Sequence, residues 1–475
     1  MVKRAASPIA KVSLSKKAKS VVKFEASDVL GEGRWIDWPA PAEQLQNARE
    51  FFKECAHGQH LTVLVPDKDA DGLSSGMIAH KTLTTLGLPS ELIKVHLLLK
   101  GNGIFKDIEQ KRMEKLVNDS LEASSSREAR IIVLDQGSRP GPPLVRQSAT
   151  NAPIRTLVID HHMSDSWPED VQVLSACNSP PISTSSLLTY LTCAPLHPDL
   201  PESTMWYGAF GVFGDLGPSE IKWGDPNGEW PASREMIEIG EEVKRIGKKS
   251  LSSAVGAINA PRRTAEYNVS EAWQIIFKAK HPDEIAKSSV LQDARDKVNQ
   301  EVERCTHTAP KFSKDGRVAL LRIDSPYQVH PVIATRWSGT LKSKKLQMIM
   351  VENPGHNPDP ELTSFSCRIT NSLRKLPEHE RPNLIGLLKE YGDLTSDGFM
   401  ERVGNDFARG HKEATGGIIR KADFELFAEK GMEIGVKDPN APPSKREKKA
   451  QPAQSNTLAS YFNISPKKEE AIKAE

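Results

Sequence analysis

Short apolar segments separated by helical patterns are the feature that most constrains the fold of this chain. The segments are rich in Val, Ile and Leu, and they lie at 61–65, 95–99, 129–135 and 154–160. Helical patterns at 73–86 and 105–122 separate them. Continuous apolar strands alternating with helices are typical of a parallel sheet that helices cover on both faces. We therefore predict an α/β fold built on a parallel sheet.

The remaining sequence indicates further parts. A helical stretch at about 230–308 leads to a second region that mixes strand patterns with a helix at "RPNLIGLLKEYG". Both ends of the chain are basic, polar and without apolar periodicity, which indicates disorder. The expected parts are a disordered basic arm (1–22), an α/β domain (23–260), a helical linker (261–310), a smaller α/β domain (311–436) and a disordered tail (437–475).

Composition excludes several classes of protein. The chain has 64 basic and 62 acidic residues, so its net charge is close to zero. Nucleic acid can therefore be attracted only by a local basic surface, and not by the charge of the whole molecule. Five scattered cysteines without C-x-x-C spacing argue against a disulfide framework and a thiolate zinc site. No secretory signal and no apolar run long enough to span a membrane are visible, so we expect an intracellular protein with no membrane contact. Basic clusters at 16–19 and 445–449 favour a nuclear location, exclusive or shared with the cytoplasm.

Carboxylates gather where the predicted strands end. The acids and histidines at or just after a strand end are Asp67, Asp69, Asp71, Asp135, Asp160, His161 and His162. Asp215, in "YGAFGVFGDLG", follows an apolar helical stretch. The carboxyl ends of parallel strands meet at one edge of a sheet, so these side chains can converge.

The pattern of these acids predicts a metal site. Alternating acids in "PDKDADG" share one face of the chain and repel each other unless a cation lies between them. Many carboxylates with one or two imidazoles suit Mn²⁺ or Mg²⁺ better than zinc or copper. The carboxylates are more numerous than one ion requires, which predicts a site for two metal ions.

On these residues the chain resembles the DHH phosphoesterases, named after the motif that Asp160, His161 and His162 form here. "DKDADG" at 67–72 resembles the first family motif, Asp135 the second and Asp215 the fourth. Some branches carry a metal-binding His four residues before the first Asp, where this chain has Val63. The resemblance therefore points to the RecJ-like branch of single-strand exonucleases.

The resemblance implies roles for the site residues. Asp135 would bridge two metal ions, and His161 and Asp215 would complete their ligands. Members of the group Asp67, Asp69 and Asp71 would bind each ion, and which two of the three do so stays open. Asp160 would orient the motif, and His162 would contact the scissile phosphate.

The second region resembles the substrate-binding domain associated with this family. Its signature corresponds to "RGHKEATGG" at 409–417, with Arg409 in place of the first Gly. This implies substrate-binding roles for Arg368 in "SFSCRIT" and for Gly410, His411, Lys412, Gly416 and Gly417. Glycines let a backbone approach a phosphate, and we expect the turn to lead into a helix that begins near Ile418.

The function implied is that of a metal-dependent phosphodiesterase. The preferred substrate is single-stranded DNA or RNA, degraded from an end during replication or repair with two Mn²⁺ ions, Mg²⁺ being the alternative. A phosphodiesterase for short oligoribonucleotides or cyclic dinucleotides, and a non-catalytic replication scaffold with a DHH fold, remain the alternatives. The intact acids argue against the scaffold.

The tail "QSNTLASYFNI" contains an apolar group in a polar surrounding. Leu458, Tyr461 and Phe462 have the spacing i, i+3, i+4, which places them on one side of a helical turn. The stretch resembles the box that docks replication and repair proteins on the DNA sliding clamp. Ser455 stands where that box has Gln. The sliding clamp is therefore a predicted partner.

Overall fold

The structure is a computed structural model that describes residues 37–145, 151–404 and 407–436. The basic arm at 1–22, both basic clusters and the stretch with Leu458, Tyr461 and Phe462 that was expected to bind the clamp lie outside the described residues. What we expect of these segments stays a prediction. Among the described residues, no helix has both the length and the apolar character that a membrane crossing needs.

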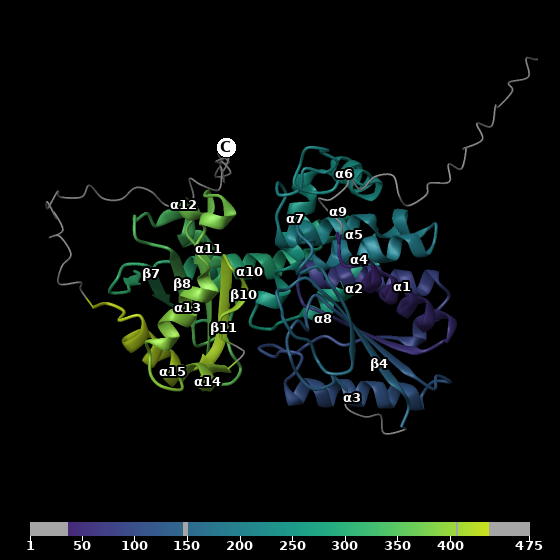
Figure 1. Cartoon of the computed structure of the whole chain (residues 1–475), viewed down its shortest axis with the longest axis horizontal. Helices are drawn as coiled ribbons and strands as arrows, with labels where there is room; N and C mark the ends of the chain where they lie inside the picture. The colour runs from purple at the N-terminus through teal and green to yellow at the C-terminus, as the bar shows by residue number, and fades with distance from the viewer. Residues whose placement is uncertain (1–36, 146–150, 405–406, 437–475) are drawn as a thin grey trace, which may run out of the picture. The chain divides into compact units, whose positions relative to one another are not determined.

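The first sheet has five strands, all parallel, in the order β2-β1-β3-β4-β5. Its strands are β1 (Leu61–Pro66), β2 (Ile93–Val95), β3 (Ala129–Leu134), β4 (Ile154–Asp160) and β5 (Val171–Ser175). The helices between and beside them are α1 (Ala42–His57), α2 (Ala70–Thr85), α3 (Asp107–Glu122), α4 (Ser185–Cys193) and α5 (Leu200–Asp215). The α/β fold with a parallel sheet is confirmed (Figure 1).

The apolar strands are buried because helices cover both faces of this sheet. Leu64, Ile132 and Leu157 belong to one core cluster with α1, α2, α4 and α5. Val63 and Ile131 point to the other face, where α3 supplies the covering side chains. In Figure 1, α3 lies on one side of the sheet and α1, α2 and α4 lie on the other.

The strand register places the predicted acids at one level. Pro66 pairs with Leu134, and Leu134 pairs with Ile159. The residues that follow these strand ends, Asp67 and Asp135, therefore lie beside Asp160 at the carboxyl edge of the sheet.

A helical stretch follows, and then a mixed second sheet. The helices are α6 (Arg234–Ile246), α7 (Lys248–Ile258), α8 (Val269–Lys278), α9 (Pro282–Lys287) and α10 (Ser289–Cys305), with the short 3₁₀ turn η3 (Pro261–Arg263) after α7. The second sheet, in the order β10-β11-β9-β8-β7-β6, consists of β6 (Lys311–Phe312), β7 (Val318–Arg322), β8 (Met348–Asn353), β9 (Leu362–Ile369), β10 (Arg409–His411) and β11 (Ala414–Arg420). Both sheets belong to one unit that extends to Gly435.

The second sheet is also covered on both faces. Leu320, Met350 and Phe365 pack with α13 (Leu384–Asp393), α14 (Phe399–Val403) and α15 (Lys421–Leu426). Leu321 and Ile349 pack on the opposite face with α10 and α11 (His330–Thr340). A short helix α12 (Asn371–Arg374) follows β9.

Two local predictions were wrong. The apolar run 95–99 was expected to be a strand, but β2 ends at Val95, and farther along the run the backbone N–H of Leu99 donates to the Glu109 carboxylate instead of to a neighbouring strand. A helix was expected to begin near Ile418, but this residue lies inside β11, which pairs antiparallel with β9, and α15 begins only at Lys421. Branched side chains such as Ile418 favour a strand.

Candidate metal centre

The loop after β1 carries the first two acids of the predicted site. Asp69 caps α2, and its Oδ1 accepts hydrogen bonds from the backbone N–H groups of Asp71 (3.2 Å) and Gly72 (3.3 Å). Glycine is required at 72, because a Cβ atom there would lie 2.6 Å from the carbonyl oxygen of Asp67. The close approach keeps Asp67 and Asp69 together at the carboxyl edge of the sheet.

Asp71 is held from another direction. Its side chain is fully buried, and its oxygens accept hydrogen bonds from the backbone N–H groups of Ser185 (2.8 Å) and Ser186 (3.0 Å), the first residues of α4. A helix N-terminus stabilises a carboxylate. Burial, followed by the charge of Asp215, nevertheless raises the pKa of Asp71 to about 6. A cation beside Asp71 would offset this cost.

Asp135 directly follows β3 and has a left-handed backbone with φ +63°. This conformation is uncommon for a residue with a side chain, and such strain concentrates at functional sites. The side chain is 4% exposed, and it accepts a hydrogen bond from the Ser185 hydroxyl (3.0 Å). Burial, followed by the charges of Asp71 and Asp69, raises the pKa of Asp135 well above its ordinary value. The surroundings of Asp135 therefore favour a cation.

Asp160, the last residue of β4, holds the two histidines that follow it. One oxygen accepts hydrogen bonds from the backbone N–H (3.1 Å) and hydroxyl (2.6 Å) of Ser138. The other accepts from the backbone N–H of His161 and from Nδ1 of His162, both at 2.8 Å. Burial raises the pKa of Asp160, but His162, His161 and Ser138 together lower it, and the net shift is downward. These contacts orient the His162 ring.

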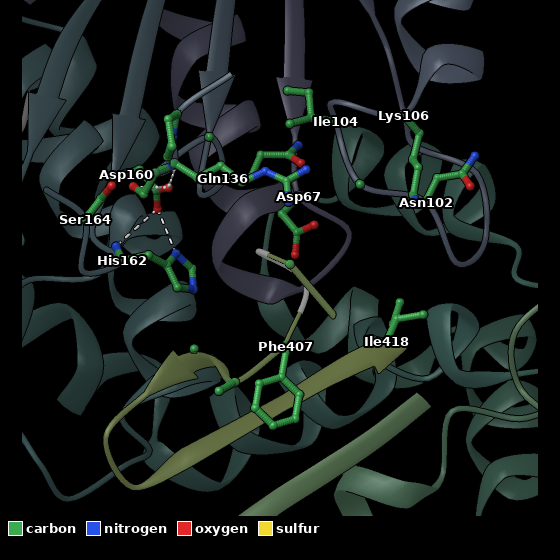
Figure 2. A pocket seen from close by; sticks show the side chains of 18 of the residues that line it. Asp67, Asn102, Ile104, Lys106, Gln136, Asp160, His162, Ser164, Phe407 and Ile418 are labelled. Carbon is green, nitrogen blue, oxygen red and sulfur yellow. Dashed lines mark hydrogen bonds and ion pairs between the residues drawn. The ribbon is translucent and has the colours of Figure 1, made fainter. Parts of the chain in front are cut away.

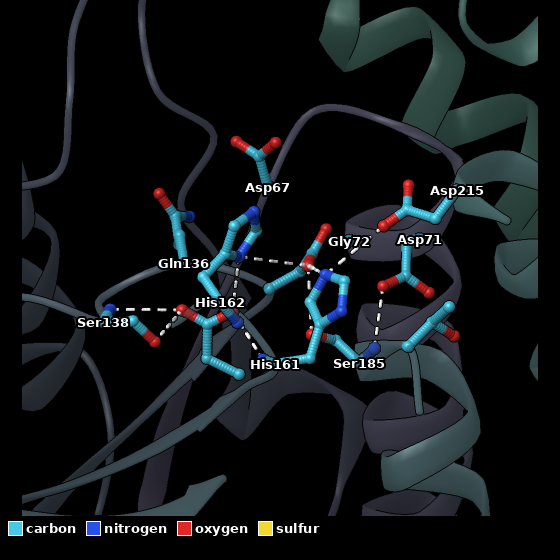
Figure 3. A network of polar contacts seen from close by, with 12 residues as sticks. Asp67, Asp71, Gly72, Gln136, Ser138, His161, His162, Ser185 and Asp215 are labelled. Carbon is cyan, nitrogen blue, oxygen red and sulfur yellow. Dashed lines mark hydrogen bonds and ion pairs between the residues drawn. The ribbon is translucent and has the colours of Figure 1, made fainter. Parts of the chain in front are cut away.

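His161 lies between two acids (Figure 3). Its Nε2 is 3.3 Å from Asp135 Oδ1 and 3.3 Å from an oxygen of Asp215, the last residue of α5. Burial lowers the pKa of His161, but Asp215 and other acids raise it to about 9. This Nε2 atom is buried and has no well-aligned hydrogen bond within the described part of the chain. An imidazole nitrogen between two carboxylates is suited to binding a metal.

Four groups of possible ligand atoms lie here among the described residues, with the atoms of each group within 4.8 Å of one another, and two of the groups share no residue and together hold five carboxylates. Of these two, the first is Asp67, Asp69 and Asp135, and the second is Asp71, His161 and Asp215. Five carboxylates and one imidazole form an oxygen-rich set, which suits Mn²⁺ or Mg²⁺. The residues present therefore fit two divalent ions.

Part of the second sheet approaches the same histidines. The ring of His411, at the end of β10, stacks on His162 with centroids 5.3 Å apart and lies 5.6 Å from His161. Gly410 has φ +108°, and a Cβ atom there would lie 2.8 Å from the carbonyl oxygen of Ala414. The hairpin of β10 and β11 thus depends on glycine to bring His411 to the histidines.

The other residues predicted from the second region have different surroundings. Gly416 and Gly417 pair with β9, and a Cβ atom at Gly416 would lie 2.4 Å from the carbonyl oxygen of Phe365. Lys412 is exposed at the tip of the hairpin. Arg368 lies on β9 and donates hydrogen bonds to the Ser366 hydroxyl (2.9 Å) and the Cys367 carbonyl (2.8 Å). The close pairing of β11 with β9 therefore explains the glycine at 416.

Several polar residues near the acids were missed at the level of sequence. Arg262, in η3, places a guanidinium nitrogen 3.5 Å from Asp69 Oδ2, and Lys68 Nζ lies 3.5 Å from Asp67 Oδ1. Asn259 accepts hydrogen bonds from the backbone N–H of Ala70 (3.1 Å) and from Arg262 (3.3 Å). The stretch "NAPRR" was the available signal, but one asparagine and two arginines after a helix form no recognisable pattern.

A cavity of about 930 Å³ extends from the acids (Figure 2). Asp67, Asp135, Asp160 and His162 are among the residues that line it. Its basic side chains are Lys68, Lys106, Arg139 and Lys389, and its apolar ones include Ile104, Ile385, Met400, Phe407 and Ile418. Figure 2 shows Ile104 across the cavity from Phe407 and Ile418. Cations and apolar surface together suit a ligand that carries both phosphates and bases.

Comparisons with known proteins place this fold. Residues 62–206 match the DHH family, N-terminal domain. RecJ from Thermus thermophilus in complex with Mn²⁺ superposes with a TM-score of 0.55 at 17% identity, and the match covers 83% of this chain and 55% of that one. The chain thus spans about half the length of that RecJ. Exonuclease RecJ bound to manganese gives 0.52 at 16% identity, over 82% of this chain and 94% of that one.

A third solved structure has the same fold. It is the DHH domain of a member of a family of ribosomal proteins, and it gives a TM-score of 0.57 at 13% identity, over 83% of this chain and 91% of that one. A search of curated proteins finds no match. The solved structures are similar in fold, and the activity has to be argued from the site itself.

Proposed function

We propose that this chain, whose residues 62–206 match the DHH family, N-terminal domain, is a metal-dependent phosphodiesterase that degrades single-stranded nucleic acid. The observation that carries the proposal is the pair of ligand groups beside the buried Asp135. Two such groups at one site would hold a pair of divalent ions. When bound, such ions neutralise phosphate oxygens and lower the pKa of a water molecule that attacks phosphorus.

The chain's own residues supply the remaining roles. Asp160 holds Nδ1 of His162, which leaves Nε2 of a ring that lines the cavity for contact with a phosphate oxygen. A fixed donor at that place stabilises the charge that develops during cleavage. Asp67, Asp69, Asp71, Asp135, His161 and Asp215 would hold the ions.

The cavity favours a single strand as the substrate. Lys68, Lys106 and Lys389 offer cations to the phosphates, and Phe407 with its apolar neighbours offers a surface to unpaired bases. Arg368 on β9 would add a further phosphate contact. Mn²⁺ is the ion we expect to support activity best, with Mg²⁺ as the alternative. A role in replication or repair in the nucleus, with docking on the sliding clamp, is part of the same proposal.

Cleavage of an end-labelled single strand tests the proposal. We expect the full-length protein to degrade the strand with Mn²⁺ and to stop when a chelator is added. Asp215→Asn should lose this activity, since it removes a carboxylate from the second ligand group. Asp199→Asn, an acid-to-amide change at a side chain that is 83% exposed, should retain it. The proposal would be refuted if the wild-type protein left the strand intact both with Mn²⁺ and with Mg²⁺.

A further inference from the structure

The loop at 96–106, between β2 and α3, forms one wall of the cavity. Leu98, Gly101, Asn102, Gly103, Ile104 and Lys106 all line it. In Figure 2 the labelled residues Asn102, Ile104 and Lys106 lie on the side of the cavity away from Phe407 and Ile418. A ligand that extends from the acids into the cavity therefore meets this loop.

A buried carboxylate beneath the loop fixes its shape. The Glu109 side chain, in the first turn of α3, is fully buried. Its Oε1 accepts hydrogen bonds from the backbone N–H of Leu99 and the amide of Asn102, both at 2.8 Å. Its Oε2 lies 3.0 Å from Nε2 of His96 and is also paired with Arg112. One side chain thus ties three positions of the loop to α3.

A second set of contacts ties the loop to the parts of the chain beyond the first sheet. Lys100 Nζ donates hydrogen bonds to the carbonyl oxygens of Ala265 (3.1 Å) and Pro326 (2.6 Å). Gly101 has φ +75°, and a Cβ atom there would lie 2.8 Å from Pro358 Cδ. The loop is therefore held by α3 through Glu109 and by Ala265 and Pro326 through Lys100, and neither Glu109 nor Lys100 lines the cavity.

We propose that Glu109 is a positioning residue that sets how tightly the cavity holds a nucleic-acid strand, with Lys100 as the second anchor of the same loop. The inference rests on the proposed function, since it concerns the same cavity. Glu109 acts through Asn102 and the backbone of the loop, which would contact nucleotides beyond the scissile phosphate. A buried ionised group with four partners keeps such a wall in one arrangement before the strand arrives.

Glu109→Gln tests this role, because it keeps the size of the side chain and removes the charge that its donors need. We expect the affinity for the strand to fall roughly tenfold, because the loop loses hydrogen bonds to a charged acceptor. Affinity is measured by anisotropy of a labelled single strand in the Asp215→Asn background, which prevents turnover. Hydrolysis of bis(p-nitrophenyl) phosphate by Glu109→Gln alone should stay close to wild type, because this small diester needs no contact with the loop.

Lys100→Met provides an independent test, since it removes the second anchor without removing a cavity charge. Like Glu109→Gln, it should weaken binding of the strand. The Lys100→Met variant also tests the inference if Glu109→Gln does not fold. Asp119→Asn is the matched control, an exposed acid on the same helix that pairs with Lys115 at the surface. Unchanged strand affinity in Lys100→Met and in folded Glu109→Gln would overturn the inference, as would equal losses on the strand and on the small diester. Wild-type protein inactive on both substrates would instead refute the proposed function.

Discussion

At the scale of the residue, the contacts of Asp160 explain why a buried acid directly precedes two histidines. Both of its carboxylate oxygens accept hydrogen bonds from Ser138, His161 or His162, although Asp160 also lies in a possible ligand group with Asp135, His161 and His162. Its effect on catalysis is therefore expected to pass through the His162 ring. That separates its role from those of Asp135 and Asp215.

Asp160→Asn should lower kcat while leaving metal affinity nearly unchanged. The amide keeps the size of the side chain but cannot accept all the hydrogen bonds that Asp160 now accepts, so His162 loses its orientation. We expect a loss of roughly 10²-fold in kcat, in the range typical of a misplaced catalytic donor. Calorimetric titration with Mn²⁺ measures the metal affinity, and steady-state kinetics measure kcat. A variant that loses metal binding and turnover together would assign Asp160 to the metal ligands instead.

Arg368→Ala should raise KM for a single strand far more than it lowers kcat. The guanidinium lies on β9 with hydrogen bonds to Ser366 and Cys367, so it can be removed without emptying the core. Kinetics on a strand of fixed length give the comparison, with the exposed Arg374→Ala as control. Unchanged KM and unchanged strand affinity would exclude Arg368 from substrate binding.

Sequence pattern identified the acids because parallel strands bring their carboxyl ends together. It could not separate Asp67, Asp69 and Asp71, because alternation gives all three the same face. The structure separates them: Asp71 is directed to the N-terminus of α4, whereas Asp69 caps α2. Arg262 escaped notice because its approach to Asp69 depends on how the helical stretch returns to the sheet, which no local pattern encodes.

At the scale of the element, the misplaced strand at 95–99 and the misplaced helix at Ile418 have one cause. Local apolar patterns do not reveal which partner takes each backbone N–H group. The N–H of Leu99 donates to Glu109 and not to a strand, and Ile418 of β11 pairs with Ser364 of β9. Long-range partners thus decided both boundaries, while the helices and strands with clear periodicity were found correctly.

The Glu109 network also predicts a dependence of stability on pH. Burial raises the pKa of Glu109, but hydrogen bonds from His96, Asn102 and Leu99 lower it from 4.5 to about 2. Because the pKa of Glu109 is lower in the folded state than in the unfolded state, the ionised side chain stabilises the fold at pH values above about 4.5, by about 3 kcal/mol at neutral pH. This stabilisation is lost as the pH falls toward 2. The free energy of unfolding should therefore differ most between wild type and Glu109→Gln near neutral pH.

Denaturant unfolding of both proteins between pH 7 and pH 3 measures this difference. We expect the gap between the two free energies to narrow as the pH falls below about 4.5. A gap that stays constant over this range would mean that the charge of Glu109 does not stabilise the loop.

At the scale of the whole molecule, the net charge of +2 offers no long-range attraction for nucleic acid. Strand binding must then come from local cations, and those that line the cavity are Lys68, Lys106, Arg139 and Lys389. A single strand that contacts all four should show a slope of log affinity against log salt of up to about −3. Anisotropy titrations over a range of salt concentrations give the slope. A slope near zero would favour a small-substrate phosphodiesterase over a nuclease.

The central claim is that two divalent ions beside Asp135 make this chain a phosphodiesterase. The most direct test is cleavage of a single-stranded oligonucleotide by purified wild type and Asp135→Asn in the presence of Mn²⁺, with circular dichroism to verify that both are folded. The account predicts metal-dependent degradation by the wild type and none by Asp135→Asn. Cleavage by folded Asp135→Asn at the wild-type rate would contradict it.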